Sequence, residues 1–149
     1  MSRPTLGDPA AQAAAELAVK EFAAELQRGG DTFDADLYDR SFAEDVLWGS
    51  PYGATLAGFA PLNAIHHHLM ESARGATDPD APPRGAPPSR FEVVSVLAPA
   101  PGVAVAQIRR QAATADGFSE MALYVLVQRE GRWWLAAAQN TPIRTPPAS

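Results

Sequence analysis

The stretch that decides the fold is Met121–Val127, which reads MALYVLV and carries an apolar side chain at every position. In an antiparallel sheet, successive side chains of a strand point to opposite faces, so both faces of this strand must be covered. One layer of helices covers one face. We therefore expect helices on one side and a second copy of the chain on the other, which makes a homodimer through the sheet face. A single sheet that curls over itself is the alternative.

Further strands surround this stretch in the second half of the chain. The segments Arg90–Ala98, Val103–Thr114, Phe118–Arg129 and Arg132–Ala138 have the composition of strands, and short connections join them. The connections contain glycine, which tolerates the positive φ that hairpin turns require. The sequence therefore predicts an antiparallel meander.

Helical patterns occupy the first half. Pro9–Gln27 has apolar residues at helical spacing, with Asp8 placed to cap its first turn and Gly29-Gly30 placed to end it. Two more helices are predicted over Asp34–Ala43 and Pro61–Arg74. Helices followed by a meander indicate an α+β fold, with three N-terminal helices in the concavity of a strongly curved, mainly antiparallel sheet.

Two short extended segments, Asp45–Gly49 and Ala54–Ala57, separate the second helix from the third. The chain is expected to form a single domain over residues 9–141, with tails at 1–8 and 142–149. Residues 75–89 contain five prolines and two glycines, a composition that predicts a loop because neither residue supports regular structure.

Composition excludes several classes of function. A net charge of -5 and a pI near 5.1 argue against nucleic-acid binding, which requires clustered cations. The chain has no cysteine, so it has no thiol nucleophile and no thiolate metal site. No signal-like N-terminus and no apolar run near ~20 residues is present, so we expect a cytoplasmic protein with no membrane partner. Lys20 is the only lysine among 12 basic residues, which is typical of a GC-rich bacterial source.

Three consecutive histidines, His66, His67 and His68, lie in the third predicted helix. Successive helical side chains diverge by about 100°, so the three cannot converge on one ion, and no metal is expected. His66 shares the apolar face of Leu62 and is predicted to point inward, where it can act as a general acid or base near neutral pH. The alternative is a core histidine with one satisfied nitrogen.

Other candidate ligand-binding residues lie on the strands. Trp48, Ser50 and Tyr52 can line the mouth of a pocket, and Gln107, Arg109, Gln139 and Asn140 can supply hydrogen bonds to a ligand. The competing interpretations are core packing for Trp48, solvent exposure for Arg109, and the end of the last strand with a turn before Pro142 for Gln139 and Asn140. The acidic residues Asp31, Asp34, Asp36 and Asp39 are interpreted as a capped, solvated helix face.

The order of elements, together with FAEDVLWGSPYG at 42–53 and WWLAAAQNT at 133–141, resembles the nuclear-transport-factor-2-like superfamily. The similarity is to its ketosteroid-isomerase-like and SnoaL-like polyketide cyclase branch, and most to the small SgcJ-type proteins of natural-product pathways, including enediyne ones. The resemblance covers residues 9–141. It implies a cone-like fold around an apolar central pocket and a dimer formed through the sheet.

The resemblance does not carry the isomerase mechanism with it. The isomerases have a general-base aspartate where this chain has Ser50, and an oxyanion-binding tyrosine where it has Phe22. Their protonated aspartate corresponds to a position near Tyr124. Serine is no base without an activating partner, and phenylalanine donates no hydrogen bond, so steroid-type isomerisation is not expected.

The function expected from the sequence is a small-molecule pocket protein of bacterial secondary-metabolite (polyketide- or enediyne-type) biosynthesis. Catalysis would be a cofactor-free cyclisation, isomerisation or hydration of an apolar or aromatic compound, with His66 as acid/base and Tyr124 as a hydrogen-bonding partner. One alternative is a non-catalytic protein that holds or shields an apolar intermediate. Another is a structural dimerising subunit.

Overall fold

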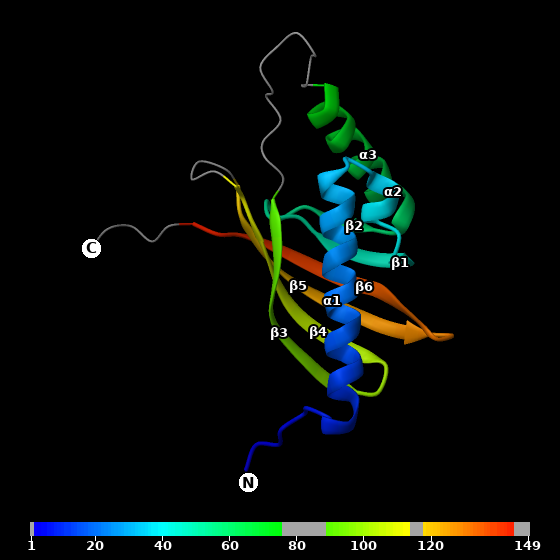
Figure 1. Ribbon diagram of the computed structural model, residues 1–149, viewed down its shortest axis with the longest axis vertical. Helices are drawn as coiled ribbons and strands as arrows, with labels where there is room; N and C mark the ends of the chain where they lie inside the picture. Colours follow the sequence, from blue (N-terminus) through cyan, green and yellow to red (C-terminus); the bar gives the residue numbers. More distant parts are fainter. Residues whose placement is uncertain (1, 76–88, 114–117, 145–149) are drawn as a thin grey trace, which may run out of the picture.

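The computed structural model describes residues 2–75, 89–113 and 118–144, and structural statements below refer to these residues. This part of the chain contains three helices and one six-stranded sheet (Figure 1). The loop predicted at residues 75–89 falls largely on residues 76–88, which lie outside the described residues. The same holds for most of the predicted C-terminal tail. No helix among the described residues is long and apolar enough to cross a membrane.

The helices are α1 (Pro9–Asp31), α2 (Ala35–Tyr38) and α3 (Phe59–Gly75). Asp8 caps α1, since its side chain accepts a hydrogen bond from the backbone N–H of Ala10 at 3.0 Å. The prediction that Gly29-Gly30 ends this helix was wrong, because α1 continues to Asp31. Tertiary packing of this last turn outweighs the low helix propensity of glycine.

The sheet has the order β2-β1-β6-β5-β4-β3, in which β1 and β6 run parallel and every other neighbouring pair is antiparallel. It is therefore a mixed sheet. The strands are β1 (Phe42–Gly49), β2 (Thr55–Ala57), β3 (Arg90–Ala100), β4 (Val103–Gln111), β5 (Glu120–Arg129) and β6 (Arg132–Pro142).

The largest error in the predicted boundaries concerns the second helix. It ends at Tyr38 instead of Ala43, and Phe42 belongs to β1, where it pairs with Leu135 of β6. Asp39 is the C-cap of the short helix, and its carbonyl accepts the backbone N–H of Phe42 at 2.9 Å. The chain therefore enters the sheet at Phe42, four residues after the end of the helix.

The helices lie on one face of the sheet, and the predicted strong curvature is not observed: the sheet is not strongly curled (Figure 1). Helix α1 packs on β3 and β4, and α3 packs on β1 and β2, so helices cover both ends of this face without the sheet closing around them. The core lies in this interface, and its largest fully buried apolar side chains are Val19, Leu26, Val46, Leu62, Ile108, Leu126 and Leu135.

Strand β5 shows the expected alternation. Ala122, Tyr124 and Leu126 are buried beneath the helices, whereas Leu123 on the opposite face is 45% exposed. A groove of about 520 Å³ runs along this outer face, with Leu47, Leu123 and Val125 in its wall. The described residues of a single chain therefore leave the outer face largely uncovered.

Gly29 permits the close approach of α2 to the end of α1. A Cβ atom at Gly29 would lie 2.6 Å from the backbone N and Cα of Tyr38, whereas one at Gly30 would meet nothing nearer than 3.9 Å. We expect Gly29→Ala to lower the free energy of unfolding by about 1–3 kcal/mol. Gly30→Ala should raise it by about 0.5–1 kcal/mol through helix propensity. Urea denaturation measures both, and stabilisation by Gly29→Ala would contradict the tight contact.

Candidate functional site

A cavity of about 640 Å³ lies between α3 and the inner face of the sheet. Its described wall is mostly apolar, with a few polar side chains set into it. The polar or aromatic side chains that matter below are Tyr38, Trp48, His66, Arg110, Glu120 and Asn140, and they come from both helices α2 and α3 and from strands β1, β4, β5 and β6.

The most buried charge beside this cavity is Asp39, which contacts the lining residue His66. Its Oδ1 lies 2.6 Å from Nδ1 of His66, and it is fully buried, with His66 at 9% exposure. The interpretation of Asp39 as part of a solvated helix face was therefore wrong. Because α2 ends at Tyr38, Asp39 no longer follows the exposed side of that helix.

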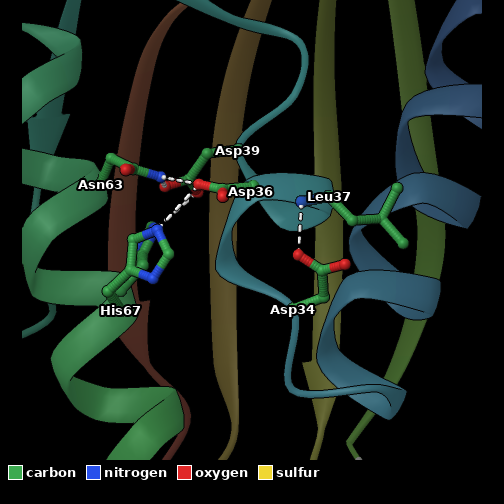
Figure 2. A network of polar contacts seen from close by, with 7 residues as sticks. Asp34, Asp36, Leu37, Asp39, Asn63 and His67 are labelled. Atoms are coloured by element: carbon green, nitrogen blue, oxygen red, sulfur yellow. Dashed lines mark hydrogen bonds and ion pairs between the residues drawn. The ribbon is translucent and has the colours of Figure 1, made fainter.

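Asn63 of α3 satisfies the second oxygen of Asp39. Its Nδ2 donates to Asp39 Oδ2 at 3.0 Å and to Asp36 Oδ1 at 3.3 Å. Figure 2 shows the carboxylates of Asp36 and Asp39 directed toward Asn63 and His67 on α3. Asn63 and His66 are three residues apart on one helix, so they lie on the same face and can hold one carboxylate together.

The same network reaches the surface through His67. Its Nε2 lies 2.8 Å from Asp36 Oδ1, and hydrogen bonding to Asp36 raises the pKa of His67 above its ordinary value. The pKa of Asp36 is lowered in turn, mainly by His67 and then by Asn63. The pair is solvent-exposed, so we assign it little stability. His68 is exposed, and no three metal-ligating side chains gather among the described residues.

Aromatic rings surround the imidazole of His66. Tyr38, Phe42 and Trp48 meet it edge-on or nearly so, with ring centroids 5.2, 6.1 and 5.4 Å away. Burial raises the pKa of Tyr38 well above its ordinary value, so its hydroxyl stays neutral. Asp39 and His66, called the dyad below, therefore meet in poorly hydrated surroundings beside the cavity.

This geometry defines which nitrogen of His66 is available. An ionised carboxylate only accepts hydrogen bonds, so Nδ1–H donates to Asp39 and the neutral ring carries its lone pair on Nε2. Among the described residues, the hydrogen bond of the His66 ring is the one between Nδ1 and Asp39, and Nε2 makes none. His66 can therefore take a proton at Nε2, and the carboxylate of Asp39 stabilises the cation that results.

Four of the predicted ligand-binding residues line the cavity. They are Trp48, Ser50, Tyr52 and Asn140. Ser50 also stabilises a turn. Its Oγ accepts from the backbone N–H groups of Tyr52 at 3.2 Å and Ala54 at 3.0 Å, which holds the turn after β1. Asn140 is 4% exposed and donates to the carbonyl of Gly49 at 2.9 Å. Tyr52 is 82% exposed.

The other predicted site residues lie elsewhere. Gln107, Arg109 and Gln139 are on the outer face of the sheet, because they alternate with inward-facing residues such as Ile108 and Asn140. Tyr124 is 3% exposed and packs edge-on against Phe22 at 5.3 Å, in the core and outside the described cavity wall. Burial raises its pKa well above the ordinary value.

Sequence reasoning missed four residues of the site: Asp39, Asn63, Arg110 and Glu120. Arg110 and Glu120 are register partners on the inner face, and Nε of the arginine lies 3.2 Å from Oε2 of the glutamate. Strand alternation could have found Arg110, because Ala104, Ala106 and Ile108 precede it at even spacing. Nothing in the local sequence indicated that Asp39 is buried.

Comparison with known proteins identifies the fold. No protein-family model and no curated protein matches the chain by sequence. Solved structures do match. A domain of unknown function with a cystatin-like fold from Nostoc punctiforme superposes with a TM-score of 0.71 at 18% identity, over 89% of this chain and 80% of that one.

Two proteins of unknown function described as NTF2-like match as well. One, from Pseudomonas putida, has a TM-score of 0.67 at 15% identity over 91% of each chain. The other, from Shewanella baltica, has a TM-score of 0.62 at 14% identity, over 89% of this chain and 97% of that one. The chain thus has an NTF2-like, cystatin-like α+β fold, as the sequence predicted, and these distant matches establish nothing about its activity.

The hydrogen bond from Asn63 to Asp39 should contribute measurably to stability. We expect Asn63→Ala to lower the free energy of unfolding by about 1–3 kcal/mol, because one oxygen of a buried carboxylate loses its partner. His67→Ala, the matched change on the exposed end of the network, should cost less than about 1 kcal/mol. Chemical denaturation of the two variants at neutral pH compares them, and equal losses would contradict the assignment.

Proposed function

We propose that this protein is a small-molecule pocket protein in which His66 acts as a general acid or base on an apolar or aromatic compound, without a cofactor. The reaction class is a cyclisation, isomerisation or hydration. The observation that carries the proposal is the 2.6 Å contact of His66 Nδ1 with the fully buried Asp39 at the wall of a cavity of about 640 Å³.

The chemistry of the wall supports this class of reaction. Each of the three reactions moves a proton to or from carbon or oxygen, for which a base and its conjugate acid suffice. Tyr38, whose ring contacts that of His66, adds a neutral hydroxyl to the residues of the wall, and Asn140 adds a buried amide. The rings of Tyr38 and Trp48 suit a flat apolar ligand.

The biological setting remains the one that the sequence resemblance suggests. We propose a role in bacterial secondary-metabolite biosynthesis of the polyketide or enediyne type, as in SnoaL-like and SgcJ-type proteins. The motifs at 42–53 and 133–141 support this proposal, together with the NTF2-like fold.

A non-catalytic binding protein is the second candidate. Two observations favour it: the described cavity wall is mostly apolar, and both oxygens of Asp39 are occupied by bonds that also tie α2 to α3. In that case the dyad holds the two helices together, and the cavity shields an apolar intermediate from water.

We also propose that two copies pair through the outer face of the sheet. Leu47 and Leu123 are 59% and 45% exposed there, and a monomer rarely leaves such a patch bare. Sedimentation equilibrium at micromolar concentration should report about twice the chain mass of 15.8 kDa. Leu123→Lys should shift the mass toward that of one chain, because a buried cation without a partner disfavours association. A wild-type protein that stays monomeric would contradict the pairing.

The proposed base can be tested before the natural substrate is known. Nitrobenzisoxazole loses its ring C–H proton to a base, its N–O bond breaks, and a coloured cyanonitrophenolate forms. We expect the wild type to accelerate this elimination and His66→Gln to lower the rate by ~10²-fold or more, since glutamine takes up no proton near neutral pH.

The control is His68→Gln, which changes an exposed histidine of the same helix and should leave the rate unchanged. Folding of each variant is checked by circular dichroism. Equal rates for wild type and folded His66→Gln would remove His66 as the base and favour the binding protein.

A further inference from the structure

The wall of the cavity contains an arginine, Arg110, whose charge is neutralised by the neighbouring Glu120. Arg110 and Glu120 are the only residues with permanent charges that line the described part of the cavity. They face each other across β4 and β5, with side chains 26% and 17% exposed and 3.2 Å between Nε and Oε2. Their formal charges cancel, so the described part of the lining carries no net charge when His66 is neutral.

Two further contacts hold Arg110 in place beside Glu120. Its Nη1 donates to Ser89 Oγ at 2.8 Å, and its guanidinium lies 5.9 Å from the ring centroid of Phe118. These contacts hold the guanidinium beside Glu120. A ligand anion that approached Arg110 would have to compete with a carboxylate that is already in place.

The electrostatic influence of this pair on its surroundings also cancels in part. At Tyr38, the charge of Arg110 lowers the pKa of the hydroxyl while that of Glu120 raises it, and burial dominates both. Behind His66, the buried Asp39 adds a further negative charge. An anionic group that enters the cavity therefore leaves water without gaining an unpaired cation from the described residues, which costs affinity.

We infer that the cavity selects a neutral aromatic or apolar molecule and rejects one that carries a carboxylate, sulfonate or phosphate, because Glu120 neutralises the arginine in its wall. The inference rests on the proposed small-molecule cavity and specifies the charge of its ligand. Glu120 is a specificity residue in this account, and Arg110 without it would attract anions.

Two fluorescent probes with the same aromatic body test the inference. N-phenylnaphthylamine is neutral, and anilinonaphthalenesulfonate adds a single sulfonate. The measured quantity is the ratio of their dissociation constants, for wild type, Glu120→Gln, Arg110→Gln and the double variant. Glutamine is close in size to both residues and retains hydrogen bonding, and thermal melts monitor the folding of each protein.

The wild type should bind the neutral probe more tightly than the sulfonate. Glu120→Gln should shift the ratio by about tenfold toward the sulfonate, and Arg110→Gln should shift it away by a similar factor. The double variant, whose wall is again neutral, should return to the wild-type ratio. If Arg110 and Glu120 only stabilise the sheet, the substitutions should change the melting temperature and leave the ratio of the two dissociation constants unchanged.

A pocket-filling variant separates failure of the inference from failure of the proposed cavity. Ala73→Trp places an indole in the cavity wall and should abolish binding of both probes. If the ratio stays constant across the charge variants while Ala73→Trp abolishes binding, selection by charge is overturned and the cavity stands. If wild type binds neither probe, or Ala73→Trp retains both, the ligand-binding cavity is overturned as well.

Discussion

A buried carboxylate must have partners for both of its oxygens, and in this protein that requirement falls on Asp39. His66 and Asn63 of α3 supply the two partners, at 2.6 and 3.0 Å. Because Asp39 directly follows α2, these two bonds fix α2 against α3. They also select the nitrogen of His66 that remains available at the cavity. The placement of α2 against α3 and the proton-accepting nitrogen of His66 thus both depend on the hydrogen bonds of Asp39.

The sheet imposes the second constraint, because its two faces differ in what covers them. The inner face supplies the core and, at one end, the cavity wall with Arg110, Glu120 and Asn140. The outer face carries Leu47, Leu123 and Val125, which the described residues of one chain leave open. The proposed ligand site and the proposed self-association surface therefore lie on opposite faces of the sheet, and a change on one face can leave the other intact.

The sequence predicted the larger features because they follow from period and local chemistry. The apolar run 121–127, the cap at Asp8 and the helical spacing of Leu62 and His66 led to the α+β class and to a buried histidine. The end of the second helix could not be predicted, because Phe42 joins β1 through a pairing with Leu135 that is distant in sequence. Asp39 was misplaced for the same reason. Gln107 and Arg109 were predicted to bind a ligand without knowledge of which residues of β4 face the helices. The arginine that faces the cavity is Arg110, one residue further along the strand.

The most direct test of this account is the tautomer of His66, observed by proton–nitrogen correlation NMR at a pH where the ring is neutral. The account predicts a proton on Nδ1 and a bare Nε2 in the wild type, with loss of this preference in Asp39→Asn. A neutral His66 that carries its proton on Nε2 in the wild type would contradict it, because Nδ1 could then no longer donate to Asp39.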